Sequence, residues 1–164
     1  MATGDPYWRL RDREPIPVEG VCACAGVVPV KLCPAVASTN PILCMACNLE
    51  VPPERLAFPE EVVDDLAYWK QLHDALVRLH LDSKEYESWA AARLADVQGR
   101  VNVLGRAVRL ALEPFRRCYL QYFTDDTNER YFPPAVCPSC GRLSQDAEHG
   151  RLRQRVCEPC SLVW

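Results

Sequence analysis

The chain has 164 residues, 49% of them hydrophobic, which is enough for one ordinary domain or for two or three small modules with a modest core. Its formal charge of −3 disfavours general binding to nucleic acid, because non-specific affinity comes from neutralising phosphates. Any contact with nucleic acid must therefore come from a local group of basic side chains. Residues 1–14 are polar and charged, and no apolar run reaches the roughly 18 residues of a membrane span, so we expect a soluble, cytoplasmic protein with no membrane partner.

Ten cysteines in such a chain favour metal ligands over disulfides, because the cytosol keeps thiols reduced. The competing interpretation is a secreted protein with a disulfide framework. If eight of the cysteines bind two Zn²⁺ ions as thiolates, the formal charge changes from −3 to about −7.

After an extended lead-in, the first cysteines form two pairs, Cys-x-Cys and Cys-x-x-Cys, separated by a short and partly strand-like segment. This spacing predicts a four-thiolate zinc site in an amino-terminal module, residues 1–58. Cys33 lies close enough to replace one ligand, and the same thiols could instead be buried as small hydrophobic groups. A redox role for Cys44 and Cys47 would need both thiols to be free of metal. Cys22 and Cys24 are instead available to complete a metal shell with them. The predicted ligands are Cys22, Cys24, Cys44 and Cys47.

From Glu60 the apolar residues recur at steps of three and four, which predicts a helix to about His80. Ser83 is expected to begin a second helix, which Gly99 thins or breaks and Pro114 ends. We expect residues 59–124 to form an antiparallel helical hairpin or small bundle. The apolar side chains expected to pack in the second helix include Tyr86, Trp89, Ala90, Leu94 and Val97.

Charge is uneven along these helices, because residues 60–87 are acidic and residues 93–117 contain six arginines. A basic helix could supply the local contact to nucleic acid, with Arg106 and Arg109 as candidates; a solvated helix face explains the same residues. His73 and His80 lie on an apolar face and are expected to be packed rather than to bind metal.

The last stretch, residues 134–164, has the pattern of a zinc ribbon, in which two Cys-x-x-Cys turns lie at the ends of a β-hairpin. Asp146 to Gly150 is expected to form the hairpin turn, and Gly141 suits a position with positive φ after the first turn. Four protein ligands leave no open position, so such a site builds structure and performs no chemistry. The predicted ligands are Cys137, Cys140, Cys157 and Cys160.

The returning strand of the ribbon alternates, which places Arg151, Arg153 and Arg155 on one face. Guanidinium groups in a row could contact phosphates or an acidic protein surface, because each offers a planar fork of donors. A solvated strand face is the plainer interpretation.

Several of these segments together resemble a bacterial family of zinc-ribbon-containing proteins of unknown function that are described as candidate nucleic-acid binders. The resemblance runs from about Trp8 to the end of the chain and implies zinc binding without catalytic residues. Members of that family carry an additional amino-terminal domain, which we do not expect in this chain, and Arg142-Leu-Ser stands where their ribbons are more aromatic. The matching segments are Cys22-Ala-Cys24, Cys44-Met-Ala-Cys47 with Val51-Pro-Pro-Glu-Arg-Leu, Glu85-Tyr-Glu-Ser-Trp-Ala90, Val101-Asn-Val-Leu-Gly105, Cys118-Tyr119, Cys137-Pro-Ser-Cys140-Gly and Cys157-Glu-Pro-Cys160.

Together these patterns predict an α+β protein of small zinc-stabilised modules around a helical middle. We find no glycine-rich phosphate loop, nucleophile elbow or paired carboxylates, and so expect neither catalysis nor a small-molecule substrate. Two functions from different classes stay open. One is nucleic-acid binding through the arginine-striped ribbon and the basic helix; the other is an adaptor that binds a partner protein through its helices.

Overall fold

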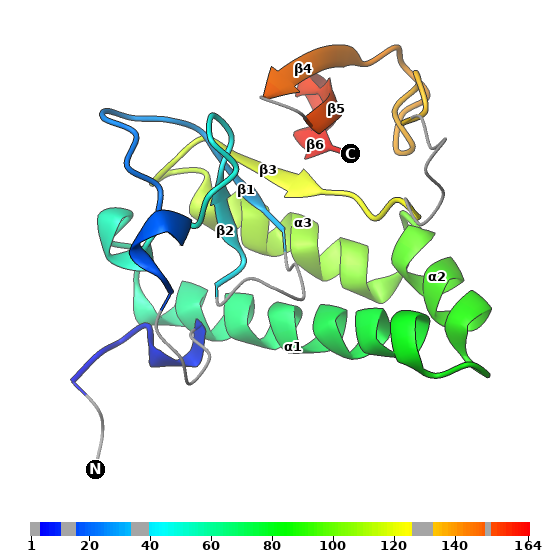
Figure 1. Ribbon diagram of the computed structural model, residues 1–164, viewed down its shortest axis with the longest axis horizontal. Helices are drawn as coiled ribbons and strands as arrows, with labels where there is room; N and C mark the ends of the chain where they lie inside the picture. The colour runs from blue at the N-terminus through cyan, green and yellow to red at the C-terminus, as the bar shows by residue number, and fades with distance from the viewer. Residues whose placement is uncertain (1–3, 11–15, 34–39, 126–132, 150–151) are drawn as a thin grey trace.

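A computed structural model describes residues 4–10, 16–33, 40–125, 133–149 and 152–164, with only the backbone at 148–149 and 152–153. One mixed sheet of six strands runs through the molecule in the order β2-β1-β3-β6-β5-β4 (Figure 1). The strands are β1 (Val30–Leu32), β2 (Ile42–Cys44), β3 (Cys118–Gln121), β4 (Gln145–His149), β5 (Leu152–Cys157) and β6 (Leu162–Val163). The helices are α1 (Glu60–Asp82), α2 (Glu87–Ala95) and α3 (Arg100–Leu112), with short 3₁₀ turns at Trp8–Leu10, Val18–Gly20, Pro53–Arg55 and Glu158–Cys160.

All three segments expected from the sequence contribute strands to this sheet. Strands β1 and β2 come from residues 1–58, β3 from 59–124, and β4 to β6 from 134–164. The central strand β3 pairs in parallel with β1 on one side and with β6 on the other. The chain is therefore α+β, with its two ends joined by backbone hydrogen bonds through a strand that follows the helices.

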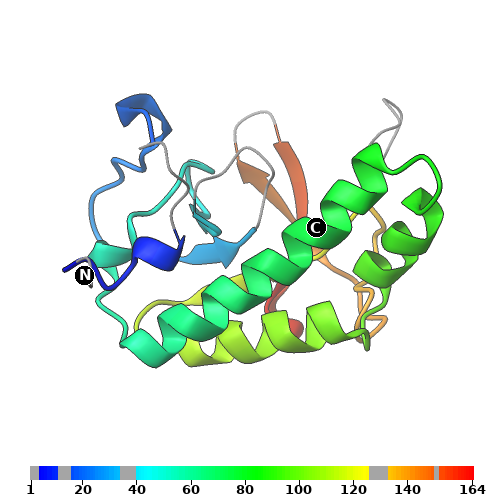
Figure 2. The same ribbon diagram turned by 90° about the horizontal axis from the view of Figure 1, so that it is seen from below.

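The helices cover one face of the sheet. α1 and α3 lie side by side beneath it in Figures 1 and 2, and the alternation of β1 and β3 turns Val30, Leu32, Cys118 and Leu120 into the same hydrophobic core. α1 begins after Pro59 with two glutamates in its first turn, where the positive end of the helix dipole favours carboxylates.

Helix α3 approaches α1 and the sheet closely at Gly105. A Cβ at this position would lie 2.8 Å from Trp69 Nε1 and 3.0 Å from a methyl group of Leu120, so a side chain does not fit. The buried Trp69 ring donates a hydrogen bond of 3.0 Å to the carbonyl of Val101. Glycine thus lets α1, α3 and β3 pack around one indole.

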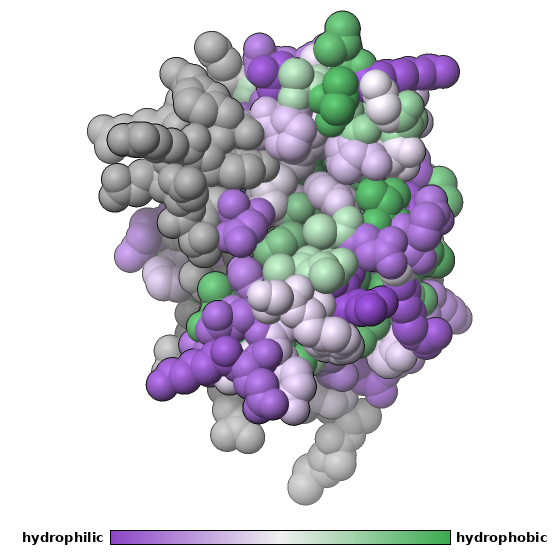
Figure 3. All heavy atoms as spheres, turned by 90° about the vertical axis from the view of Figure 1, so that its right-hand side faces the viewer, coloured by the Kyte–Doolittle hydropathy of each residue, from purple (hydrophilic) through white to green (hydrophobic). Residues whose placement is uncertain are grey.

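The second helix begins later than Ser83, the position expected from the sequence. Ser83 Oγ accepts a hydrogen bond from the Tyr86 amide, and α2 starts at Glu87. Ala90 and Leu94 are buried as expected, but Tyr86 and Trp89 are half exposed. They belong to the end of the molecule seen in Figure 3, where pale and hydrophobic atoms gather among hydrophilic ones. The expectation that both aromatic rings pack in the core is wrong, because the short α2 presents only one face to α1.

The expected hairpin turn at Asp146 to Gly150 is also wrong. Gln145–His149 forms β4 and pairs with β5, and Gly150 lies outside the described part of the chain. After α3, residues Cys118–Gln121 form strand β3, and Cys118 is fully buried in the core. Within the described residues, no helix combines the length and the apolar character needed to cross a bilayer.

Candidate metal centres

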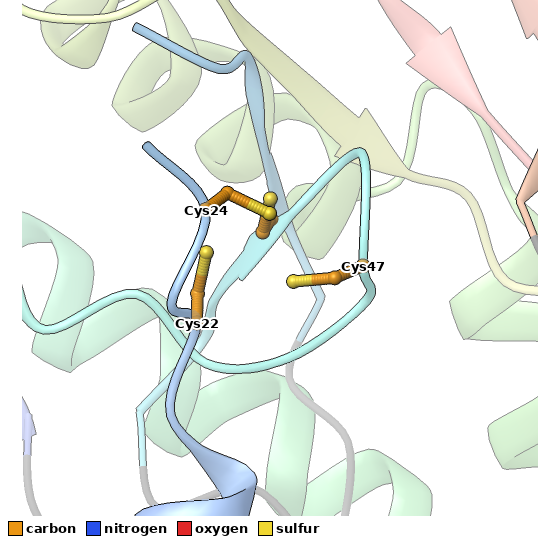
Figure 4. Close-up of side chains that lie close together, drawn as sticks. Cys22, Cys24 and Cys47 are labelled. Atoms are coloured by element: carbon orange, nitrogen blue, oxygen red, sulfur yellow. The ribbon is translucent and has the colours of Figure 1, made fainter. Parts of the chain in front are cut away.

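The N-terminal four-sulfur group is assembled from two segments that flank β1 and β2. Cys22 and Cys24 precede β1, while Cys44 ends β2 and Cys47 lies in the turn that follows. Figure 4 shows Cys22, Cys24 and Cys47 with their side chains converging on one space. All four sulfur atoms lie within 4.8 Å of one another. Four sulfurs at this separation can hold one metal ion, because bonds of about 2.3 Å in a tetrahedral shell place the sulfurs about 3.8 Å apart.

The C-terminal four-sulfur group has the same composition. Cys137 and Cys140 lie ahead of β4, Cys157 ends β5, and Cys160 ends the following 3₁₀ turn; their sulfurs also lie within 4.8 Å of one another. The sulfurs of Cys140 and Cys157 are 3.7 Å apart, which suits a shared metal and is far longer than a disulfide bond of about 2.05 Å. None of the ten cysteines is in a disulfide, so a framework of cystines is excluded.

The backbone explains why the Cys-x-x-Cys turns present their sulfurs inward. In the first turn the Ala46 amide donates to Cys44 Sγ, and in the second the Ser139 amide donates to Cys137 Sγ, each over 3.4 Å. Each turn closes with a residue of positive φ, Asn48 (60°) or Gly141 (70°), whose amide donates 2.9 Å back to the carbonyl of the first cysteine. Gly141 has the positive φ expected from the sequence, and Asn48 is the residue other than glycine that tolerates this conformation best.

The thiols of each group cannot all ionise without a cation, because neighbouring thiolates repel one another. At Cys22, burial disfavours the thiolate, but hydrogen bonds from the Cys24 backbone and the other three thiols outweigh it and lower the pKa to about 7. Burial and the neighbouring thiols raise the pKa of Cys47 to about 12. In the other group, a hydrogen bond from the Arg142 backbone leads the causes that lower the pKa of Cys140 to about 7, while burial raises that of Cys157 to about 12. A divalent metal removes this conflict, since it binds all four sulfurs as thiolates.

Two arginines, Arg55 and Arg116, lie beside the N-terminal group. Arg55 donates hydrogen bonds of 2.6 Å and 3.0 Å to the carbonyls of Cys22 and Cys24, which fixes the course of the first cysteine pair. Arg116 lines the small cavity beside these cysteines, donates to the Val28 carbonyl over 3.3 Å, and keeps its Nε buried without a hydrogen-bond partner. Positive charge beside four thiolates offsets part of their repulsion.

The C-terminal group is held to the core through Glu158, which lies between Cys157 and Cys160. Its carboxylate accepts hydrogen bonds of 2.9 Å and 3.0 Å from the Tyr119 hydroxyl and pairs with Arg117 at 3.0 Å. Arg117 also pairs with Glu113 at 2.7 Å, just beyond α3. The carboxylate therefore links the cysteine turn to β3 and to the end of a helix.

Cys33, His73 and His80 stand apart from both groups. Cys33 follows β1, and burial raises the pKa of its thiol. His73 packs against the Trp69 ring with 5.8 Å between centroids, and burial lowers its pKa to about 4. His80 packs edge-on against Phe123 with 5.3 Å between centroids.

The five arginines considered for nucleic acid do not form one described surface. Arg109 is buried, pairs with Glu113 at 2.7 Å and donates to the Cys118 carbonyl, while Arg106 donates 2.7 Å to the Val97 carbonyl. Arg155 pairs with Asp146 across the hairpin at 3.1 Å. Arg151 and the side chain of Arg153 lie outside the described part of the protein.

Sequence patterns did not identify Arg55, Arg116 or Glu158 as neighbours of the cysteines. Arg55 lies in the segment Val51-Pro-Pro-Glu-Arg-Leu, which was noted only for the family resemblance, and Arg116 was counted among the six arginines of residues 93–117. Of the three, only Glu158 could have been identified from sequence, because it lies inside a Cys-x-x-Cys turn. The partners of all three are set by pairings between distant segments.

No protein-family model, curated protein or solved structure matches this chain. The resemblance to a bacterial zinc-ribbon family therefore stays a prediction beyond its central feature, the two groups of four cysteines.

Proposed function

We propose that this protein is a non-catalytic adaptor, stabilised by two zinc ions, that binds a partner protein through its helices. The ligand set supports a structural role for zinc. Each metal centre offers four sulfur ligands and no histidine or carboxylate, which is the ligand set of structural zinc. A tetrahedral shell completed by protein leaves no position for water or substrate.

The observation that carries the adaptor function is an apolar groove at the junction of α1 and α2. It has a volume of about 360 Å³ and is lined by Leu79, Tyr86 and Trp89. Their exposed fractions are 37%, 51% and 50%. Arg93 lies over the Trp89 ring, 5.7 Å from its centroid. This set is called the aromatic groove below.

Exposed tyrosine and tryptophan side chains next to leucine are costly to keep in water and are the residue types that contribute most to protein interfaces. Figure 3 shows hydrophilic side chains beside pale and hydrophobic ones at the end of the molecule where α2 lies, and protein interfaces have a polar rim of this kind. The volume of the aromatic groove falls within the usual range of roughly 300–1,000 Å³ for concave binding sites. These features favour a partner that inserts an apolar side chain.

Nucleic-acid binding has less support, because the guanidinium groups of Arg106, Arg109 and Arg155 all have partners within the protein. A phosphate would have to displace these partners before binding. We therefore treat binding to nucleic acid as an outcome that the experiment must separate from binding to protein.

The experiment uses the full zinc-loaded chain with a photo-crosslinking amino acid at Ser88, which neighbours the aromatic groove in sequence. Partners crosslinked in a cell extract are compared among the wild type, Trp89→Ala and Trp8→Ala. Trp8 is a matched control, since it is 56% exposed but lies in the amino-terminal segment. We expect one partner to be lost from Trp89→Ala, retained by Trp8→Ala, and bound by the purified wild type with little dependence on salt.

A second experiment measures binding to 20-nucleotide DNA and RNA probes by fluorescence anisotropy. Tight binding that falls steeply between about 50 and 200 mM salt and is unchanged in Trp89→Ala would replace the adaptor function by nucleic-acid binding. Equal crosslinking by both tryptophan variants would remove the aromatic groove from the function.

A further inference from the structure

The two four-sulfur groups differ in how open their ligands are to solvent. All eight ligands lie within the described residues, and Cys140 is the one with an exposed side chain; the other seven are buried or partly buried. The turn around it is open as well, because residues 139–143 are all exposed. In Figure 1 this orange segment forms a loop at the edge of the molecule. Small reagents in water can therefore reach one sulfur of the C-terminal group directly.

The N-terminal group offers no such sulfur. Cys22 and Cys44 are buried, and Cys24 and Cys47 are partly buried. Arg55 also donates hydrogen bonds of 2.6 Å and 3.0 Å to the carbonyls of Cys22 and Cys24. A reagent that attacks sulfur must therefore displace protein before it reaches this group, whereas at Cys140 it need not.

A closed shell of four protein ligands blocks chemistry at a bound metal, but it does not block chemistry at an exposed sulfur. A sulfur that binds zinc is a thiolate, and the thiolate is the form of cysteine that is oxidised most readily. Cys140 also has a neighbour that can complete the reaction, because its sulfur lies 3.7 Å from that of Cys157. A disulfide bond is about 2.05 Å long, so the two sulfurs need to approach by about 1.7 Å.

We propose that Cys140 is a site of reversible oxidation by hydroperoxides, which joins it to Cys157 as a disulfide and releases zinc from the C-terminal group. With hydrogen peroxide, the Cys140 thiolate donates an electron pair to one oxygen and the O–O bond breaks. The other oxygen leaves as hydroxide and takes up a proton to give water, while Cys140 becomes a sulfenic acid. The Cys157 thiolate then attacks the Cys140 sulfur, the S–O bond breaks, and a second hydroxide leaves and takes up a proton. The two sulfurs together lose two electrons, which reduce the peroxide to two waters.

Oxidation removes two of the four ligands of the C-terminal group. Cys137 and Cys160 remain, and two sulfurs are too few for a stable zinc site. The second turn stays on the sheet, because the Glu158 carboxylate accepts hydrogen bonds of 2.9 Å and 3.0 Å from the Tyr119 hydroxyl and pairs with Arg117 at 3.0 Å. A thiol reductant can therefore restore the two thiolates, and zinc can bind again. The proposal rests on the zinc binding proposed above and not on the aromatic groove.

The experiment adds hydrogen peroxide to the full chain after native mass spectrometry has measured its bound zinc. A chromogenic chelator follows zinc release, and peptide mapping after rapid alkylation identifies the oxidised cysteines. We expect the first zinc ion to leave at least about tenfold faster than the second, since access to sulfur differs between the groups while the ligands do not. The first product should be the Cys140–Cys157 disulfide, and a thiol reductant with added zinc should restore two zinc ions per chain.

Cys140→His replaces the exposed thiolate by an imidazole, which also binds zinc. We expect this variant to hold two zinc ions and to release the C-terminal one about tenfold more slowly than the wild type, since its exposed ligand carries no sulfur. Cys47→His is the matched control, because Cys47 is the last ligand of the corresponding turn in the N-terminal group. It should lose the C-terminal zinc as fast as the wild type, and so should Cys33→Ser, which removes a thiol outside both groups. The peptide map of the wild type tests the proposal without either histidine variant.

Simultaneous release of both zinc ions, a first disulfide other than Cys140–Cys157, or no release at all would each overturn the proposal. So would a Cys140→His protein with two zinc ions that loses the C-terminal one as fast as the wild type. A chain with fewer than two zinc ions before oxidation would contradict the zinc-stabilised function and this proposal together. A chain with two zinc ions that resists peroxide would contradict this proposal alone. Neither result bears on crosslinking at the aromatic groove.

Discussion

The two four-sulfur groups have the same ligands but differ in what surrounds them. Both groups have buried members in the main hydrophobic core, Cys22 and Cys44 of the N-terminal group and Cys137 and Cys157 of the C-terminal group. They differ in two ways: Arg55 binds the carbonyls of the first N-terminal pair, and the C-terminal group leaves Cys140 exposed. The N-terminal ligands are therefore the better enclosed by the protein.

This difference teaches that ligand spacing alone does not determine how much a metal contributes to stability. At the N-terminal group, loss of metal would leave thiolates beside buried apolar side chains and destabilise the core. At the C-terminal group, loss of metal would release the turns that hold β4 and β5, while β3 and the helices keep their own contacts.

The largest expected effect is that of Cys22→Ser. Serine is a poor ligand for zinc and is buried here among apolar groups, so we expect loss of the N-terminal metal and a fall of more than about 4 kcal/mol in the free energy of unfolding. Urea unfolding followed by circular dichroism at 222 nm measures this free energy of unfolding. Cys33→Ser is the matched control and should retain two zinc ions by native mass spectrometry, because Cys33 belongs to neither group. A stable Cys22→Ser protein with two zinc ions would remove Cys22 from the ligands.

The second prediction concerns Cys140→Ser, at the exposed ligand of the other group. We expect one zinc ion per chain, loss of the β4–β5 amide signals, and a helical signal at 222 nm within about 10% of the wild type, because Cys140 is exposed and α1 packs against α2 and α3. If the helices unfolded together with the ribbon, the C-terminal group would be required for the packing of the helices as well as for the ribbon.

The cysteine pairs and the long helix were predictable because their signals are local. Cys-x-x-Cys fixes two ligands within one turn, and the apolar period of three and four residues over 60–82 marks α1. The sheet was not predictable in this way. β3 has only four residues, and its parallel partners lie far away in sequence: Val30 pairs with Cys118, 88 residues later, and Leu120 pairs with Leu162, 42 residues later.

The errors at the surface have related causes. Tyr86 and Trp89 have the helical spacing of core residues, but spacing says nothing about whether a second helix covers them. Arg109 looks like a surface cation, yet Glu113 and the Cys118 carbonyl satisfy it inside the protein. Burial of such groups depends on tertiary contacts that a single sequence does not reveal.

A smaller effect is expected for Arg55→Ala, which removes two hydrogen bonds to the carbonyls of Cys22 and Cys24. We expect zinc at the N-terminal group to be released to a chelator about tenfold faster, since hydrogen bonds to a charged donor contribute roughly 1.5–3 kcal/mol in the bound geometry. A chromogenic chelator added to wild type, Arg55→Ala and the exposed control Arg78→Ala gives the rates. Zinc should leave the C-terminal group at the same rate in all three proteins. If zinc also left the N-terminal group at the same rate in Arg55→Ala as in the wild type, Arg55 would not support the metal.

The smallest effect is expected at the carboxylate that connects α3 to the C-terminal group. Burial opposes ionisation of Glu113, but Arg117, the Cys118 amide and Arg109 outweigh it and hold its pKa below the usual value. A carboxyl group with a lowered folded-state pKa stabilises the fold above its unfolded pKa of about 4.3, and this contribution is lost as the pH falls through the folded-state value. We therefore expect Glu113→Gln to lower the free energy of unfolding by about 1 kcal/mol at pH 7 and to match the wild type at pH 3, in thermal melts of the helices. A difference that stayed constant from pH 7 to pH 3 would mean that Glu113 acts through packing and not through its charge.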